Sequence, residues 1–136
     1  MVHQFHVLVV DDEPPLREIM ADALVTEGYR VTTAGNGAEA LDRLTDDRPD
    51  LIVLDLMMPV LDGWTFIEGY RESAGAEVPI LSSSAVMSDP VAERLQQLGV
   101  RICLSKPFDL ADFLECVARV LGVTPASLRP PSPPLG

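Results

Sequence analysis

The chain has 136 residues, the length of one globular domain, and 47% of them are hydrophobic, which argues against a disordered protein. Its 21 acidic and 10 basic residues give a formal net charge of −11, so unaided binding to nucleic acid or to an anionic membrane is not expected. Two cysteines, Cys103 and Cys116, are too few for a disulfide framework and favour a reducing compartment. Neither a signal peptide nor a membrane-spanning run is evident, so we expect a cytoplasmic protein.

Apolar runs alternate along the chain with stretches of helical periodicity. Five apolar runs predict strands, at residues 5–10, 29–34, 51–54, 78–81 and 100–104. The stretch after each run carries one apolar stripe, and these stripes begin at Leu16, Ala40, Trp64, Val91 and Leu110. Strands that are apolar on both faces and are joined by helices form a parallel sheet covered on both sides. The pattern therefore predicts an α/β fold of five βα units.

The composition changes near the end of the chain. Residues 123–136 hold five of the 12 prolines and show no apolar periodicity. Such a segment is extended and has no core of its own. We therefore predict one domain at residues 1–122 and a proline-rich flexible tail or linker at residues 123–136. Whether the domain stands alone or belongs to a longer regulator stays open.

Reactive side chains follow four of the five predicted strands. Asp11 and Asp12 follow the first, Asp55 follows the third, the serines at 82–84 follow the fourth, and Lys106 follows the fifth. Ligands of open parallel sheets bind beyond the carboxyl ends of the strands. Taken singly, each residue is more often a turn former or helix cap, but their combination in this order is far more specific.

Carboxylates on neighbouring strands would repel each other, and a hard divalent cation such as Mg²⁺ would offset that repulsion. A carboxylate can also act as a nucleophile and form an acyl phosphate. In phosphoryl transfer the protein mainly positions groups and neutralises charge on the oxygens, which a lysine and a serine hydroxyl could do here. The predicted site therefore suits phosphoryl chemistry on an aspartate.

These residues and their surroundings resemble the receiver domain of response regulators in two-component signalling. The resemblance covers residues 5–121. It rests on VVDDE at 9–13, LDLMMP at 54–59, DG at 62–63, PIL at 79–81, SA at 84–85 and KPF at 106–108. The fold it implies is the flavodoxin-like three-layer sandwich of the CheY-like superfamily, with a five-stranded parallel sheet of order 2-1-3-4-5.

The resemblance makes Asp55 the phosphoacceptor and implies a bound Mg²⁺ or Mn²⁺ ion. Asp11, Asp12, Asp55 and the backbone carbonyl of Met57 would hold the ion, with Asp12 a more direct ligand than Asp11. Met57 also lies where a hydrolytic water would approach, and its apolar side chain cannot orient that water. We therefore predict a moderately long-lived phosphoaspartate.

The resemblance also implies a switch. Ser84 matches the family's switch hydroxyl, and Lys106 would bind first Asp55 and then the phosphoryl group. The Lys106–Pro107 bond is similar to one that is usually cis in the family. One position departs from the family pattern, because Cys103 stands where an aromatic ring usually follows the switch hydroxyl. A thiol is too small for that role, so the coupling, though not the phosphorylation, is in question.

The implied partners are a histidine kinase or a histidine phosphotransfer domain and a downstream effector protein or domain. The candidate docking residues lie in the first helix and after the last strand, at Pro14, Pro15, Leu16, Ile19 and Phe108. A homodimer that forms on phosphorylation is also compatible with the resemblance.

The function so implied is that of a signalling domain rather than an enzyme acting on other substrates. The main alternative is a phosphorylation-independent interaction module on the same fold. Such a module would be expected to lack the acidic pair, the phosphoacceptor or the lysine. This sequence has all of them, as Asp11, Asp12, Asp55 and Lys106. A phosphatase of the haloacid-dehalogenase type would need a second acid at Met57, and flavin binding would place phosphate beside acids that repel it.

Overall fold

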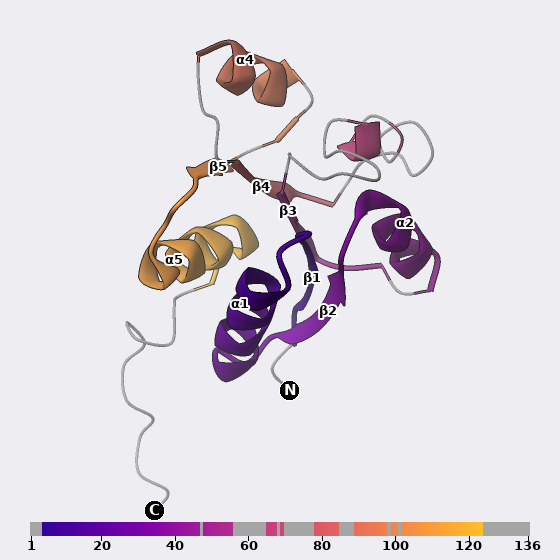
Figure 1. Cartoon of the computed structure of the whole chain (residues 1–136). Helices are drawn as coiled ribbons and strands as arrows, with labels where there is room; N and C mark the ends of the chain where they lie inside the picture. The colour runs from indigo at the N-terminus through magenta and orange to yellow at the C-terminus, as the bar shows by residue number, and fades with distance from the viewer. Residues whose placement is uncertain are drawn as a thin grey trace, which may run out of the picture.

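Five strands form a single parallel sheet in the order β2-β1-β3-β4-β5. The computed structural model describes residues 4–46, 48–55, 65–67, 69, 78–84, 89–97, 99–100 and 102–123. The strands are β1 His6–Val10, β2 Arg30–Ala34, β3 Leu51–Asp55, β4 Ile80–Ser84 and β5 Ile102–Ser105 (Figure 1). Both the predicted α/β class and the order 2-1-3-4-5 are confirmed.

Helices connect the strands at the places that the apolar stripes predict. They are α1 Pro14–Thr26, α2 Gly37–Asp46, α4 Asp89–Gln97 and α5 Leu110–Leu121, and residues 65–67 and 69 are also helical. Two prolines open α1 in the first turn, where a missing backbone N–H costs least. Gly122 ends α5 in the left-handed region, at φ 73°, which a residue without Cβ adopts freely. No helix in the described ranges is long and apolar enough to cross a lipid bilayer.

The sheet has a separate core on each face. On one face, Val7, Val9, Val53 and Leu81 pack against α1 and α5, which lie side by side in Figure 1. On the other face, the alternate residues of the same strands pack against α2, α4 and the helical residues 66 and 67. Because side chains alternate along a strand, β1, β3 and β4 each supply both cores, and β1 and β3 are buried along their whole length.

The boundaries of β4 differ from the prediction. The sequence predicts a strand over residues 78–81 followed by a serine loop, whereas β4 extends through Ser84. Ser82 and Ser83 pair with Leu54 and Asp55 of β3, and with residues of β5 on the other side. Serine has little intrinsic preference for strands, but main-chain pairing on both sides outweighs it. Of the predicted tail at residues 123–136, only Val123 lies within the described residues, and residues 56–64, which follow β3, lie outside them.

Candidate functional site

Three aspartates meet at the carboxyl end of the two central strands. Val10 of β1 pairs with Leu54 of β3, so Asp11 and Asp55 come next on adjacent strands. Both are buried, with 1% and 3% of their surface exposed, and Asp12 is half-buried beside them. Carboxylate oxygens of all three lie within 4.8 Å of one another. The predicted convergence of acids at this edge is therefore present in the fold.

Lys106 brings a cation into this acidic cluster from the end of β5. Its Nζ lies 3.0 Å from Asp11 Oδ2 and 3.3 Å from Asp55 Oδ2, and only 12% of its side chain is exposed. A third carboxylate, that of the exposed Glu13, lies 3.6 Å away. One ammonium thus neutralises part of the charge of three acids, and the two buried contacts are screened least by solvent.

These contacts decide the protonation of Lys106. Burial lowers its pKa, but the hydrogen bond and charge of Asp11, followed by those of Asp55, outweigh burial and raise the pKa above 10.5. The ammonium is therefore fully charged at neutral pH. A fixed positive charge beside a buried carboxylate is what a negatively charged phosphoryl group requires on arrival.

The carboxylate of Asp11 is more fully occupied than that of Asp12. Asp11 Oδ1 accepts a hydrogen bond from the Glu13 backbone N–H at 2.9 Å, while Oδ2 accepts from Lys106 at 3.0 Å. Asp12 makes no hydrogen bond or ion pair to another described residue. The oxygens of Asp12 are therefore the more available for a metal ion.

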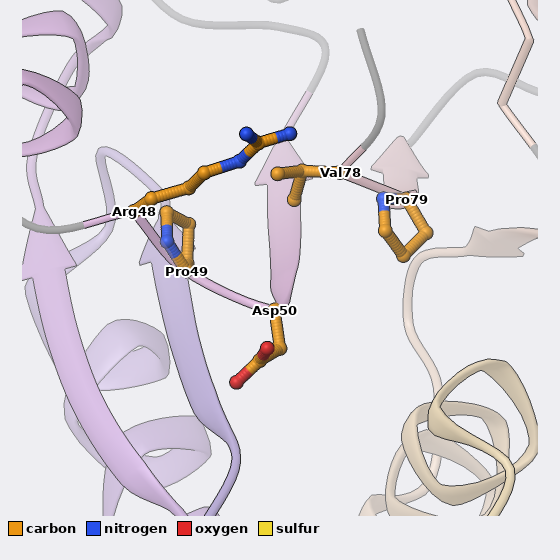
Figure 2. Close-up of a pocket in the computed structure, with 5 residues that line it drawn as sticks. All are labelled: Arg48, Pro49, Asp50, Val78 and Pro79. Atoms are coloured by element: carbon orange, nitrogen blue, oxygen red, sulfur yellow. The ribbon is translucent and has the colours of Figure 1, made fainter.

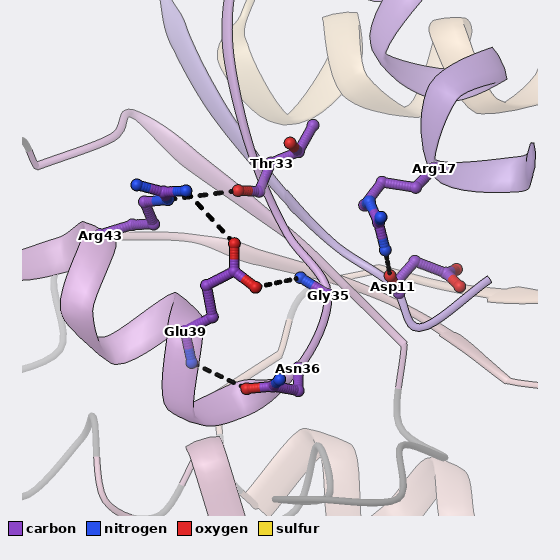
Figure 3. A network of polar contacts seen from close by, with 7 residues as sticks. All are labelled: Asp11, Arg17, Thr33, Gly35, Asn36, Glu39 and Arg43. Atoms are coloured by element: carbon purple, nitrogen blue, oxygen red, sulfur yellow. Dashed lines mark hydrogen bonds and ion pairs between the residues drawn. The ribbon is translucent and has the colours of Figure 1, made fainter. Parts of the chain in front are cut away.

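Arg17 is a residue of the site that sequence reasoning missed. Its Nη1 donates to the backbone carbonyl of Asp11 at 2.7 Å, which fixes the turn between β1 and α1 (Figure 3). A Cβ at Gly35 would lie 3.2 Å from the same Nη1, so a larger residue there would require the tip of the Arg17 side chain to shift by a few tenths of an ångström. No local motif predicts this contact, because it depends on how α1 packs beside β2.

The turn that follows β2 is held by α2 (Figure 3). Asn36 Oδ1 accepts from the Glu39 backbone N–H at 2.8 Å and so caps the helix, while Glu39 Oε2 accepts from the Gly35 N–H at 3.1 Å. Arg43, one turn further along, forms an ion pair with Glu39 at 3.2 Å. These contacts link the turn after β2 to α2.

The predicted switch residues lie on the two strands at the edge of the site. Ser84 ends β4, where it pairs with Ser105 of β5, and Cys103 lies within β5 opposite Ser82. The Lys106–Pro107 peptide bond is cis. Met57 lies outside the described residues.

The predicted docking residues are only partly exposed. Pro14, Pro15 and Ile19 are exposed on α1, with Ile19 at 49%. Leu16 and Phe108, in contrast, pack against the core between the sheet and α1 and α5. The structure therefore divides this set into three surface positions and two that are half-buried.

A small open pocket of about 280 Å³ lies at the amino-terminal ends of β3 and β4, away from the aspartates. It is lined by Arg48, Pro49, Asp50, Val78 and Pro79 (Figure 2). Asp50 there accepts a hydrogen bond from the backbone N–H of His6 at 2.8 Å, so it ties β3 to the start of β1. The pocket lies at the other end of the strands from Asp11 and Asp55. Among the lining residues that the structure describes, the only carboxylate, that of Asp50, has the structural role of holding His6.

Comparison with known proteins places the chain in a family. The family model described as the response regulator receiver domain matches residues 7–118. The chain is 32% identical to the chemotaxis protein CheY4 of Vibrio cholerae, with a TM-score of 0.82 over 87% of this chain and 99% of that one. A response regulator receiver protein from Pseudomonas putida is also 32% identical, with a TM-score of 0.81 over 88% and 99% of the two chains. The chain thus belongs to the response regulator receiver domain family.

The curated relatives are longer than this chain. The response regulator MprA of Mycobacterium sp. (strain KMS) is 41% identical over 131 residues, which are 95% of this chain and 56% of that protein. MprA of Mycobacterium avium (strain 104) is 44% identical over 117 residues, which are 85% and 50% of the two. The chain thus spans about half the length of the curated relatives it matches.

Proposed function

We propose that Asp55 accepts a phosphoryl group from the phosphohistidine of a histidine kinase or a histidine phosphotransfer domain. The observation that carries the proposal is a nearly buried carboxylate at a strand end, with Lys106 Nζ 3.3 Å from Oδ2 and two further aspartates beside it. An Asp55 oxygen attacks phosphorus in line. The P–O bond forms as the P–N bond to imidazole breaks, and the electron pair stays on the imidazole nitrogen.

The acidic cluster fits a divalent metal ion. Two oxygen ligands of one Mg²⁺ lie at most about 4.2 Å apart, since each bond is about 2.1 Å. The oxygens of Asp11, Asp12 and Asp55 lie within 4.8 Å of one another, so small side-chain rotations bring them into range. We propose that Asp12 and Asp55 bind Mg²⁺ or Mn²⁺ directly, with Asp11 beside them and the Met57 carbonyl as a further ligand. The ion would neutralise charge on the phosphoryl oxygens.

Lys106 supplies the second positive charge. Its ammonium reaches both Asp11 and Asp55 from β5, so it already lies at the edge where the phosphoryl group would arrive. We propose that it moves from Asp55 to a phosphoryl oxygen while Asp11 keeps it oriented. In the same step Ser84, at the end of β4, would turn toward the new charge.

The output of the switch would be a change in partner affinity. The two states differ in contacts around the phosphoryl group, which shifts their populations. We propose that the face formed by α4, β5 and α5 binds the effector protein or domain, and that Pro14, Pro15 and Ile19 contact the phosphodonor. With Cys103 in β5, the response would not depend on an aromatic ring there. This role is that of a cytoplasmic signalling domain, without turnover of other substrates.

Labelling by a small-molecule phosphodonor tests the proposal. The wild-type chain should incorporate phosphate only with Mg²⁺ or Mn²⁺ present, and Asp55→Asn should abolish the label. Asp112→Asn is the matched control, because Asp112 is an exposed aspartate on α5 outside the cluster, and it should label like wild type. Full labelling of Asp55→Asn would refute the assignment. No labelling of the wild type would favour the phosphorylation-independent interaction module.

A further inference from the structure

Two buried serine hydroxyls in β4 have no part in the site described so far. Ser82 and Ser83 are 0% and 2% exposed, and neither Oγ forms a hydrogen bond within the described part of the chain. A buried hydroxyl without a partner is costly, whereas an apolar residue of similar size would cost nothing. Such a group suggests a partner that is present only in another state of the protein.

The sheet register shows that the two serines face opposite ways. Val53 and Leu81 are partners across β3 and β4, and both pack in the core beneath α1 and α5. Two residues further along, Asp55 and Ser83 are partners, so they share that face because side chains alternate along a strand. Ser82 is paired with Leu54, which belongs to the core on the other face. Only Ser83 therefore lies on the side of the phosphoacceptor.

Lys106 links Ser83 to the chemistry. Its ammonium, which follows β5, contacts Asp55 at the end of β3, and β4 is the strand between them. The lysine side chain must therefore pass the end of β4, close to Ser83. Neighbouring strands are about 4.8 Å apart. A turn of the serine side chain about its Cα–Cβ bond thus brings its hydroxyl within hydrogen-bond reach of the Asp55 carboxyl group.

We propose that the Ser83 hydroxyl donates a hydrogen bond to the free carboxyl oxygen of Asp55 once the other oxygen is phosphorylated. In the structure Lys106 contacts Oδ2 of Asp55 at 3.3 Å. Phosphoryl oxygens carry more charge than an acyl carbonyl and attract the ammonium away, which would leave that carboxyl oxygen to the proposed metal ion, with a second lone pair that has no hydrogen-bond donor. Ser83 then replaces Lys106, and no proton is transferred. The inference rests on the proposed phosphorylation of Asp55, and Ser83 is distinct from the switch residue Ser84.

Equilibrium binding of beryllofluoride in the presence of Mg²⁺, followed by ¹⁹F NMR, tests the proposal. Beryllofluoride bonds to one carboxylate oxygen and mimics the phosphoryl group. Ser83→Ala should weaken its binding roughly fivefold, the effect of one lost hydrogen bond between uncharged groups. Ser82→Ala is the matched control, since it removes an equally buried, equally unpaired hydroxyl from the opposite face, and it should bind like wild type. Ser83→Thr, which keeps the hydroxyl, should restore most of the affinity.

A structural role for Ser83 would give a different pattern. Without beryllofluoride, neither alanine variant should have a lower free energy of unfolding in urea than wild type, because neither serine hydroxyl is hydrogen-bonded within the described part of the chain. Should Ser83→Ala not fold, Ser83→Cys offers a slightly larger side chain of the same shape with a much weaker donor and should show the same loss of affinity. Equal binding by Ser83→Ala and wild type, or equal weakening in both alanine variants, would overturn the inference. Failure of the wild type itself to bind would instead refute the proposed function.

Discussion

Lys106 is the one lysine of the chain, and it lies between the buried carboxylates of Asp11 and Asp55. Lys106→Met keeps much of the side-chain volume and removes the charge. The two carboxylates then face each other without a cation, at a place where only 12% of the lysine side chain is exposed. We expect a marked loss of stability in the absence of divalent ions.

The magnitude of that loss can be bounded. Removing one member of a buried ion pair costs about 3–5 kcal/mol, because a buried charge is left uncompensated. Glu13 adds little, because its side chain is 61% exposed. We therefore expect Lys106→Met to lower the free energy of unfolding by about 3 kcal/mol at pH 7.

Urea unfolding with and without Mg²⁺ measures the effect. Mg²⁺ should stabilise Lys106→Met more than wild type, because the ion compensates for the missing ammonium, and a ligand at 100 times its Kd adds about 2.7 kcal/mol. Arg119→Met is the control, since its ion pair with Glu115 is exposed and should contribute less than about 1 kcal/mol. Equal stability of Lys106→Met and wild type at pH 7 without Mg²⁺ would refute the reasoning.

Three further outcomes follow from the same contacts. Lys106→Arg should retain most of the stability but impair the response to phosphodonor, because a planar guanidinium cannot replace a compact ammonium between two carboxylates; unchanged labelling and partner binding would contradict this. The pKa of Lys106 is raised by Asp11 and Asp55 despite its burial, so its contribution to stability is complete below pH 10.5 and is lost as pH rises through the folded-state pKa. Between pH 10 and 12, the free energy of unfolding measured with urea should therefore fall more for wild type than for Lys106→Met. An equal fall in the two proteins would argue against the pairing of Lys106 with the two aspartates. Phe113→Ala, at a fully buried ring stacked on Phe108 at 5.8 Å, should cost about 3–5 kcal/mol, and a loss below about 1 kcal/mol in urea unfolding would show that the core there readily collapses.

The strand pattern was predictable because it depends on burial on both faces. Each of the five apolar runs overlaps an observed strand, and the helical stripes lie where the observed helices lie. The end of β4 was not predictable from residue preferences. Its three serines favour a loop when considered alone, yet Ser82 and Ser83 are paired on both sides by β3 and β5, and Ser84 is paired with β5. The pairing strands are distant in the sequence, so a local sequence pattern does not show how they extend β4.

The candidate site shows the same division. The positions of Asp11, Asp55 and Lys106 after predicted strands were enough to indicate that they converge. The contact of Arg17 with the Asp11 carbonyl was not indicated, because it depends on the packing of α1 beside the turn after β2. The opposite orientations of Ser82 and Ser83 also required the register with β3.

The chain's net charge of −11 and its single lysine are properties of the sequence, and so is the order in which acids and lysine follow the strands. The alternation of apolar runs and helical stripes determined the α/β class. The order of the acids and the lysine determined the kind of chemistry, because parallel strands bring their carboxyl ends together. Only the tertiary structure decided which charges meet. The register of β1 against β3 sets Asp11 beside Asp55, and the sheet order brings Lys106 across β4 to within 3.0 and 3.3 Å of them. Distances of this kind depend on pairing and packing between segments up to 95 residues apart, which no local stretch of sequence encodes.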